Sequence, residues 1–434
     1  MGGFRPMSDR LIVPAGMSRR HFLGHLATTS MALPALQFLG SLEANAEMVR
    51  KKNKSCILLW MGGGPSHMDT WNLKPESEKN GGEFKPIQTS ASGVSICEHL
   101  PTVAKQMHHL SIIRSLNSKE GNHDRGTYMM HTGWTPNPTV VHPSFGSVCS
   151  YELGDRLEDF DLPHCISINT QGQGAGFLGM AHAPFVVQNP NAPIADLQPP
   201  KGVDGMRMGR RLQMLGMVED NFVGQRRGQR GVDHKAVYAK TIRMMNSRYT
   251  QAFKLDDEPA AVREAYGKSS FGSGCLMARR LVEQGVTFVE VALGGWDTHT
   301  DVFETLSKRL LPELDKAMGS LVADLARRGL LDSTMIVWMG DFGRTPRINQ
   351  NAGRDHWPRS WSIVMGGGGL KGGQAIGDTD KDGIDIVDRP VGVMDVIATM
   401  TKTMGIDLAT QYTTPRGRPM KVVDGGEPIK ELVG

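Results

Sequence analysis

The sequence has no internal repeat, no low-complexity linker and no CxxC pair of cysteines. It has no large excess of one charge either: the formal net charge is +4, of which residues 1–46 carry +2. The remaining +2 gives no electrostatic case for binding nucleic acid or an anionic membrane. The five cysteines are an odd number, so one or two disulfides could form after export, but the sequence does not pair them.

The composition is that of an ordinary soluble globular protein. Hydrophobic residues make up 39% of the 434 residues, and charged residues make up 22%. A chain of this length can bury one large core, or one core with a smaller companion. The 52 glycines predict long loops between the secondary-structure elements.

Three elements of an export signal follow one another near the N-terminus. Residues 18–23 (SRRHFL) hold a twin arginine and an apolar pair, residues 22–42 are mostly apolar, and residues 44–46 (ANA) form a small-x-small cleavage site. The apolar region is too weak for a stable membrane span. We predict a twin-arginine signal peptide over residues 1–46 and a periplasmic or secreted protein. The alternative is a cytoplasmic protein with a chance arginine pair.

Continuous apolar runs alternate with helical patterns along residues 47–434. Predicted strands cover 55–61, 109–116, 165–168, 286–293, 334–339 and 361–365, and the main predicted helices cover 271–284, 302–328 and 391–404. Strands that are apolar at every position indicate a buried parallel sheet. The sequence therefore predicts a single α/β domain with a doubly wound, mostly parallel sheet and helices on both faces. Its functional residues are expected at the carboxyl ends of the strands.

Residues 170–235 are irregular and rich in Gly, Pro, Asn and Arg. They do not continue the alternation of strands and helices. We predict that they form an insertion or cap over the strand ends, with some helix near residues 207–219.

Carboxylates and histidines follow two of the predicted strands. Asp297 and His299 come just after the strand 286–293, and residues two apart in an extended segment point the same way, so both can converge on one point. Such a pair binds divalent metal ions such as zinc. We predict a metal-assisted hydrolase site that takes a divalent ion (Zn, Ca, Mg or Mn). Its candidate ligands are Asp69, Asp297, His299, Asp341, Asp355 and His356.

The glycine-rich residues 62–65 follow the first predicted strand and precede Ser66 and Asp69. Glycines let the backbone approach a ligand closely, so Ser66 could be a nucleophile and Asp69 a metal ligand. A tight turn in which Ser or Asp caps a helix explains the same residues equally well.

A second set of polar residues suits an oxyanion such as phosphate or sulfate. Part of it lies at a predicted strand-to-helix junction, where anions bind well, and the arginines can hold an anion in bidentate fashion. The candidates are His123, Asp124, Arg125, Thr127, Arg344 and Arg354. The competing interpretations are a solvated loop whose Asp caps a helix and a surface ion-pair loop.

Six segments carry a family resemblance. They are GGGPSHMDTWNLKP from residue 62, NHDRGTYMMHTGW from 122, REAYGKSSFGSGCLMARRLVEQGVTFVEV from 263, GGWDTHTD from 294, GDFGRTPRIN from 340 and GRDHWP from 353. Over about residues 18–430 the chain resembles the DUF1501 family of exported bacterial proteins. It is more distantly similar to the alkaline phosphatase/sulfatase superfamily.

The superfamily resemblance implies an alkaline phosphatase-like fold with a two-metal site. Asp297, His299 and His356 resemble the ligands of the first metal. Asp341 resembles an acidic ligand of the second metal.

The chain also departs from the superfamily pattern. Gly62 and Gly63 stand where an Asp follows the first strand, so that acidic role could pass to Asp69. The stretch HDRGTYMMHTG offers no Cys or Ser as the nucleophile. Phe342 stands where the superfamily has a His.

These patterns predict an exported, metal-dependent hydrolase that acts on a phosphate or sulfate ester, either a small molecule or a polysaccharide. The alternative is a non-catalytic periplasmic binding or scaffold protein that retains the fold. The missing nucleophile favours the alternative, whereas the Asp/His set favours the enzyme. No nucleic-acid partner and no stable membrane span are expected.

Overall fold

The structure is a computed structural model that describes residues 54–154, 160–194, 202–224, 237–238, 241–245 and 247–434. The chain divides into two units, Met1–Lys52 and Asn53–Gly434. The first unit, with the predicted signal peptide, lies outside the described residues.

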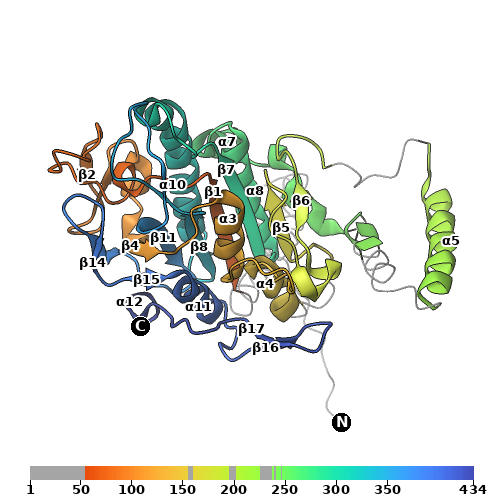
Figure 1. The fold of residues 1–434 in the computed structure, drawn as a ribbon. Coiled ribbons are helices and arrows are strands. Elements are labelled where there is room, and N and C mark those ends of the chain that lie inside the picture. The colour runs from red at the N-terminus through yellow and green to blue at the C-terminus, as the bar shows by residue number, and fades with distance from the viewer. Residues whose placement is uncertain (1–53, 155–159, 195–201, 225–236, 239–240, 246) are drawn as a thin grey trace, which may run out of the picture. The chain divides into compact units, whose positions relative to one another are not determined.

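One large sheet organises the second unit (Figure 1). Its nine described strands are β1 Ser55–Gly62, β4 Leu110–Asn117, β5 Cys165–Ile168, β6 Phe185–Val187, β7 Phe288–Gly294, β8 Thr334–Gly340, β11 Trp361–Gly367, β12 Gln374–Ile376 and β15 Val391–Gly392. Their order is β12-β4-β11-β8-β1-β7-β5-β6, and β15 also pairs with β4. All pairs are parallel except those of β11, which runs antiparallel to β4 and β8. The predicted mostly parallel α/β sheet is therefore confirmed.

The central strand β1 shows why the strands are apolar at every position. Ile57, Leu59 and Met61 belong to the hydrophobic core on one face of the sheet. Cys56 and Leu58, which alternate with them, belong to the core on the other face. Successive side chains point to opposite faces, so a strand covered on both sides must be apolar throughout.

Helices cover both faces of the sheet (Figure 1). Those of eight or more residues are α3 His123–Thr132, α4 Phe145–Leu153, α5 Gly205–Gly224, α8 Ser270–Gln284, α10 Leu311–Arg327 and α11 Val393–Thr403. Shorter helices are α2 Pro101–Ala104, α7 Ala260–Tyr266, α9 Val302–Thr305 and α12 Lys430–Val433. Helices α8 and α10 supply the first core, and α4 and α11 supply the second. The predicted helix 302–328 is divided into α9, a π-helical turn Leu306–Leu310, and α10.

Four two-stranded sheets lie outside the main sheet. They are β2 Pro86–Gln88 with β3 Ser95–Cys97, β9 Gly343–Arg344 with β10 His356–Trp357, β13 Asp378–Thr379 with β14 Ile386–Asp388, and β16 Gln411–Thr413 with β17 Pro419–Lys421. The pair β9–β10 holds the residues that follow β8, so it bears directly on the site described below.

The segment 170–235 supplies more regular structure than its composition predicts. It contributes β6 to the edge of the main sheet, and it contains α5. Residues 195–201 and 225–235 of this segment lie outside the described residues. The five cysteines all lie in the described part of the chain, are buried and form no disulfide. Among the described helices, none has the length and apolar composition that crossing a membrane requires.

Candidate metal centre

The candidate centre lies at the carboxyl edge of the sheet, where the loops after β1, β7 and β8 meet. These strands are adjacent and parallel, so their carboxyl ends share one edge. Two glycines allow the loops to touch. A Cβ on Gly63 would lie 2.4 Å from the backbone nitrogen of Asp297, and a Cβ on Gly64 would lie 2.6 Å from the carbonyl oxygen of Phe342. Both glycines also have positive φ angles, a backbone conformation that residues with a side chain rarely adopt.

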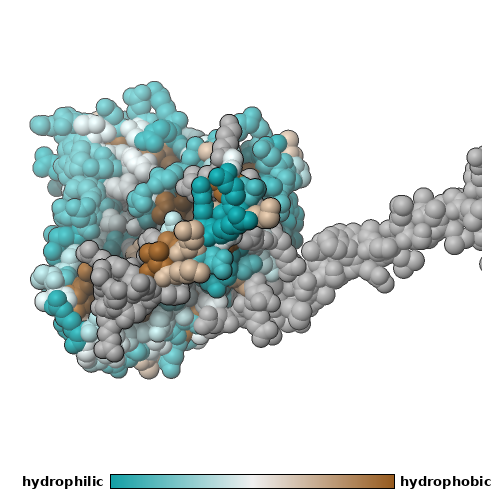
Figure 2. Space-filling view, turned by 90° about the vertical axis from the view of Figure 1, so that its right-hand side faces the viewer, coloured by the Kyte–Doolittle hydropathy of each residue, from teal (hydrophilic) through white to brown (hydrophobic). Residues whose placement is uncertain are grey.

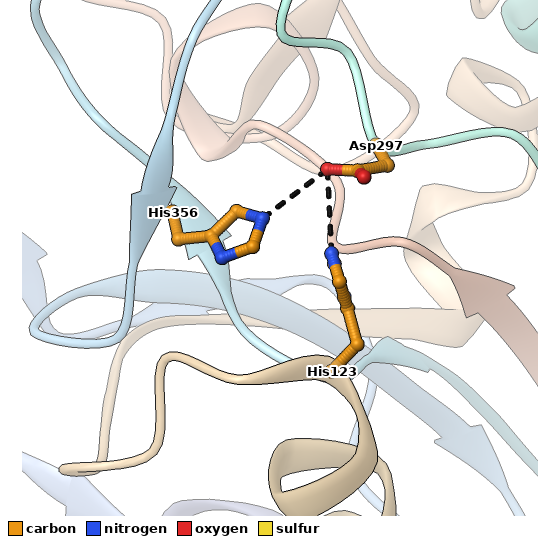
Figure 3. A group of neighbouring side chains, drawn as sticks. All are labelled: His123, Asp297 and His356. Atoms are coloured by element: carbon orange, nitrogen blue, oxygen red, sulfur yellow. Dashed lines mark hydrogen bonds and ion pairs between the residues drawn. The ribbon is translucent and has the colours of Figure 1, made fainter.

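Three imidazoles point at one carboxylate oxygen. The Nε2 atom of His299 lies 3.0 Å from Oδ1 of Asp297, and those of His123 and His356 each lie 3.3 Å from it. Figure 3 shows His123 and His356 approaching Asp297 from different elements. For His123, Asp297 and His356, one potential ligand atom from each residue lies within 4.8 Å of the other two.

The opposite nitrogen of each ring faces a hydrogen-bond acceptor, which favours the tautomer with the proton on Nδ1. The acceptors of the three Nδ1 atoms are Oδ2 of Asp341 for His123 at 2.5 Å, Oδ1 of Asp355 for His299 at 2.7 Å, and the carbonyl oxygen of Gly121 for His356 at 2.8 Å. With the proton on Nδ1, each Nε2 presents a lone pair to the centre. Metal-binding histidines are oriented by carboxylates and carbonyls in the same way.

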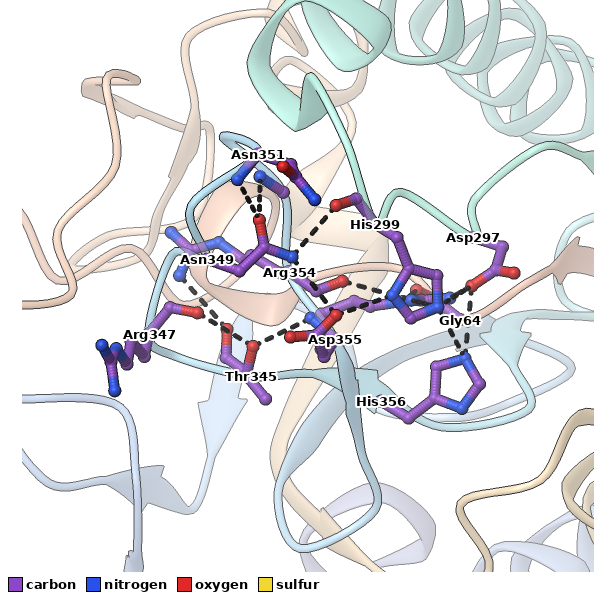
Figure 4. A network of polar contacts seen from close by, with 12 residues as sticks. Gly64, Asp297, His299, Thr345, Arg347, Asn349, Asn351, Arg354, Asp355 and His356 are labelled. Carbon is purple, nitrogen blue, oxygen red and sulfur yellow. Dashed lines mark hydrogen bonds and ion pairs between the residues drawn. The ribbon is translucent and has the colours of Figure 1, made fainter.

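Two lone pairs that face one another repel, and a cation between them removes the repulsion. The Nε2 atoms of His299 and His356 are 3.0 Å apart, and neither has a proton to share when both Nδ1 atoms donate (Figure 4). The Nε2 atom of His123 is buried and has no hydrogen-bond partner in the described part of the chain. The donor set of three imidazole nitrogens and one carboxylate therefore fits a divalent metal ion.

Arg344 holds Asp297 in its ionised form. Its fully buried guanidinium contacts Oδ1 of Asp297 and donates 2.9 Å to the carbonyl oxygen of Gly64. Burial by itself would raise the pKa of Asp297, but the hydrogen bond and charge of Arg344, together with nearby histidines, lower it to about 2. Nη1 of Arg344 lies 3.4 Å from Nε2 of His299. The guanidinium of Arg344 is thus already bound by other groups of the protein.

Asp341 lies deeper than Asp297. Burial raises its pKa, against the opposing hydrogen bond from His123. Its Oδ2 is taken by His123, but its Oδ1 is buried and has no hydrogen-bond partner in the described residues. An unsatisfied buried carboxylate oxygen is costly, so it is a further place where a cation would be stabilised.

The structure places Asp69 in a buried ion pair. Arg354 binds both carboxylate oxygens of Asp69, at 2.7 and 3.0 Å, and neither side chain is exposed. Arg354 also donates 3.2 Å to the carbonyl oxygen of Asn80 and contacts that of Pro346. Asp69 and Arg354 are therefore engaged with each other, and the structure does not bring either to the three imidazoles.

The remaining predicted residues lie around the centre. Ser66 is buried, and its hydroxyl has no hydrogen-bond partner in the described structure. Arg125 is paired with Glu120 through two hydrogen bonds of 2.7 and 2.6 Å. Asp124 is exposed in the first turn of α3, and Thr127 is half-buried in the next turn.

His123 was expected near an oxyanion, and the structure groups it with the potential metal ligands. It is the first residue of α3, which follows β4. Because β11 is antiparallel to both β4 and β8, β4 runs in the same direction as β8 and ends at the same edge. Whether His123 lies near the centre depends on the order of the strands in the sheet, and the sequence does not give that order.

We expect that replacing Asp355 by Asn weakens metal binding about 10- to 100-fold, because Asp355 orients His299 without touching the centre. Asp355 is exposed, so the fold should be unaffected. Titration of metal into the metal-free variant and wild type measures the change. Equal affinities would show that Asp355 does not orient His299.

A buried ion pair joins α3 to β7 beneath the centre. Nε2 of His131 lies 3.2 Å from Oε1 of Glu290, and both side chains are buried. Burial alone would lower the pKa of His131, but Glu290 raises it above the ordinary value of 6.5. The pair therefore stabilises the fold fully below pH 6.5, and this stability is lost as the pH rises through the raised pKa.

We predict that His131→Gln lowers the free energy of unfolding by about 3 kcal/mol at low pH and by less at high pH. Urea unfolding of wild type and variant at several pH values measures this difference. A difference that grows with pH would contradict the assignment of a charged His131.

These observations define an α/β protein with a candidate metal centre at the carboxyl edge of its sheet. The chain belongs to the family described as "Protein of unknown function (DUF1501)", which it matches over residues 53–433. A search of curated proteins finds no match.

Solved structures with a detectable likeness include a sulfatase, a synthase and a protein in complex with an oligosaccharide. The PsFucS1 sulfatase from Pseudoalteromonas sp. is 13% identical, with 84% of this chain and 70% of that chain covered and a TM-score of 0.35. The lipoteichoic acid synthase LtaP from Listeria monocytogenes is 9% identical, with 84% and 78% covered and a TM-score of 0.34. Ps i-CgsB in complex with k-i-k-neocarrahexaose is 11% identical, with 82% and 72% covered and a TM-score of 0.36. Identities and TM-scores this low transfer neither a site nor a substrate to this chain.

Proposed function

We propose that this protein is an exported, metal-dependent hydrolase of phosphate or sulfate esters. The observation that carries the proposal is the convergence of three Nε2 atoms, from His123, His299 and His356, on one oxygen of Asp297. Each of these rings has its other nitrogen hydrogen-bonded to an acceptor, so all three are prepared to bind a cation.

The donor set also limits which metal ions fit the centre. Three imidazole nitrogens and one carboxylate suit zinc better than calcium or magnesium, which prefer oxygen ligands. The residues that would hold the ion are His123, Asp297, His299 and His356. Asp341, with one unsatisfied buried oxygen beside His123, could take part in a second position.

Such an ion, when bound, polarises an ester oxygen and lowers the pKa of water. The chain contributes orientation and charge. Asp341 and Asp355 hold two of the rings in place, and Arg344 keeps Asp297 ionised. The side chains of His299 and Asp297 are 42% and 46% exposed, so a substrate can reach them from solvent. Because the hydroxyl of Ser66 is buried, we propose attack by water rather than by Ser66.

The N-terminus of α3 adds a further anion-stabilising feature. His123 is the first residue of this ten-residue helix, and Asn122 caps it by accepting from the backbone of Arg125. The backbone N–H groups at the start of the helix and the helix dipole favour negative charge beside the centre. This supports a substrate that carries a phosphate or sulfate group.

A second candidate function is a non-catalytic metal-binding or scaffold protein. It is favoured by the engagement of the two arginines expected to hold an oxyanion: Arg344 binds Asp297 and loop carbonyls, and Arg354 binds Asp69. Neither has a free guanidinium edge for a substrate anion.

Metal analysis and hydrolysis assays separate the two functions. The purified protein is analysed for bound metal and then assayed on an aryl phosphate and an aryl sulfate, with Asp297→Asn as the inactive control. Bound metal with turnover that the variant lacks supports the hydrolase. Bound metal without turnover on any ester supports a metal-binding protein. The absence of metal after reconstitution with zinc or manganese contradicts the hydrolase and supports the scaffold protein.

A further inference from the structure

Helix α5 exposes an unusual surface. Four of its apolar side chains are largely in solvent: Met206 at 74%, Met214 at 68%, Met217 at 64% and Val218 at 67%. In the described part of the chain, α5 does not pack extensively against any other helix or strand. Figure 2 looks onto the face that carries α5, and it shows hydrophobic and strongly hydrophilic atoms side by side there. Contiguous exposed apolar side chains of this kind mark an interaction surface.

Arginines share this surface with the apolar side chains. Residues 206–218 contain Arg207, Arg210 and Arg211, all exposed, and no acidic residue. At about 100° per residue, these three arginines and the four exposed apolar side chains fall within an arc of about 140°. The surface is therefore both apolar and positively charged over the same stretch of helix.

We propose that α5 docks the protein onto the surface of an anionic lipid bilayer. Such a surface satisfies both kinds of side chain at once. The Met and Val side chains enter the boundary between headgroups and acyl chains, while the long arginines extend to the lipid phosphates. A soluble polyanion would pair with the arginines but leave four apolar side chains in water, so it fits the surface less well.

The near-neutral net charge of the whole chain conceals this feature, because the three arginines lie close together in residues 207–211, whereas Glu219 and Asp220 lie near the other end of α5. The docking is also peripheral, since three arginines and the glycines Gly209 and Gly216 within α5 make it unsuitable as a membrane span. Helix α5 thus lies on the bilayer rather than across it.

Co-sedimentation of the full chain with vesicles tests the proposal. Phosphatidylcholine vesicles are compared with vesicles that also contain phosphatidylglycerol. We expect binding to the anionic vesicles, with Arg207→Gln/Arg211→Gln reducing it about 10- to 30-fold. Met214→Ser/Met217→Ser should reduce it about tenfold or more, because it removes the inserted apolar surface.

Two control variants remove the same kinds of exposed side chain elsewhere. Arg416→Gln/Arg418→Gln and Val141→Ser/Met180→Ser should leave vesicle binding unchanged. Because every variant keeps the same N-terminal region, the differences report on α5. Binding that survives both α5 variants would overturn the proposal. Loss of binding in the arginine variant alone would also overturn the proposal, because it would indicate a soluble polyanion or simple charge attraction. The absence of any binding to anionic vesicles would overturn it as well.

Discussion

Asp297→Asn is expected to abolish metal binding and any metal-dependent activity. The substitution removes the carboxylate charge on which the three Nε2 atoms converge, and leaves three imidazoles beside the guanidinium of Arg344. Losing a ligand should cost more than the roughly 100-fold loss of affinity expected at an orienting residue. Elemental analysis and metal titration of the purified variant measure this directly.

A matched control separates this effect from a general loss of carboxylate charge. Asp332 is exposed just before β8 begins, at the opposite edge of the sheet from the centre. Asp332→Asn should bind metal as wild type does, and both variants should have circular dichroism spectra typical of the folded protein. Full metal occupancy in Asp297→Asn would remove the case for this centre.

Asp69→Ala is expected to destabilise the fold by about 3–5 kcal/mol, because it leaves the fully buried Arg354 without its carboxylate partner. Thermal and urea unfolding measure the loss. The double variant Asp69→Leu/Arg354→Met should recover much of it, since replacing both charges by apolar side chains removes the unpaired charge.

The same variant distinguishes two roles for Asp69. As a structural residue, its loss lowers the melting temperature but leaves the metal content per folded molecule unchanged. As a metal ligand, its loss would lower the metal content with little change in melting temperature. The buried pairing with Arg354 leads us to expect the first result.

The sequence predicted the sheet because the physical signal was strong. Strands such as β1 and β8 are buried on both faces, and this burial requires apolar residues at every position. The same reasoning placed functional residues at the carboxyl ends of the strands. The spacing of Asp297 and His299 also indicated that their side chains point the same way. In the structure, Nε2 of His299 lies 3.0 Å from Oδ1 of Asp297.

Other features could not be predicted because they depend on which strands are neighbours. His123 joins the centre only because β4 runs parallel to β8 and ends at the same edge. The sequence shows that a strand exists, but not its place in the sheet.

The division of roles among the polar residues was also decided by tertiary structure. Asp355 was expected to bind metal and instead lies behind His299, while Arg354 is buried against Asp69 rather than open to an anion. A carboxylate or guanidinium has the same appearance in a sequence whether it faces a ligand or a buried partner. By itself the sequence determined the periodicity of burial, and hence the layers of the fold and the edge that holds the site. Only packing decided which charged groups neutralise one another and which imidazoles remain directed at a common point.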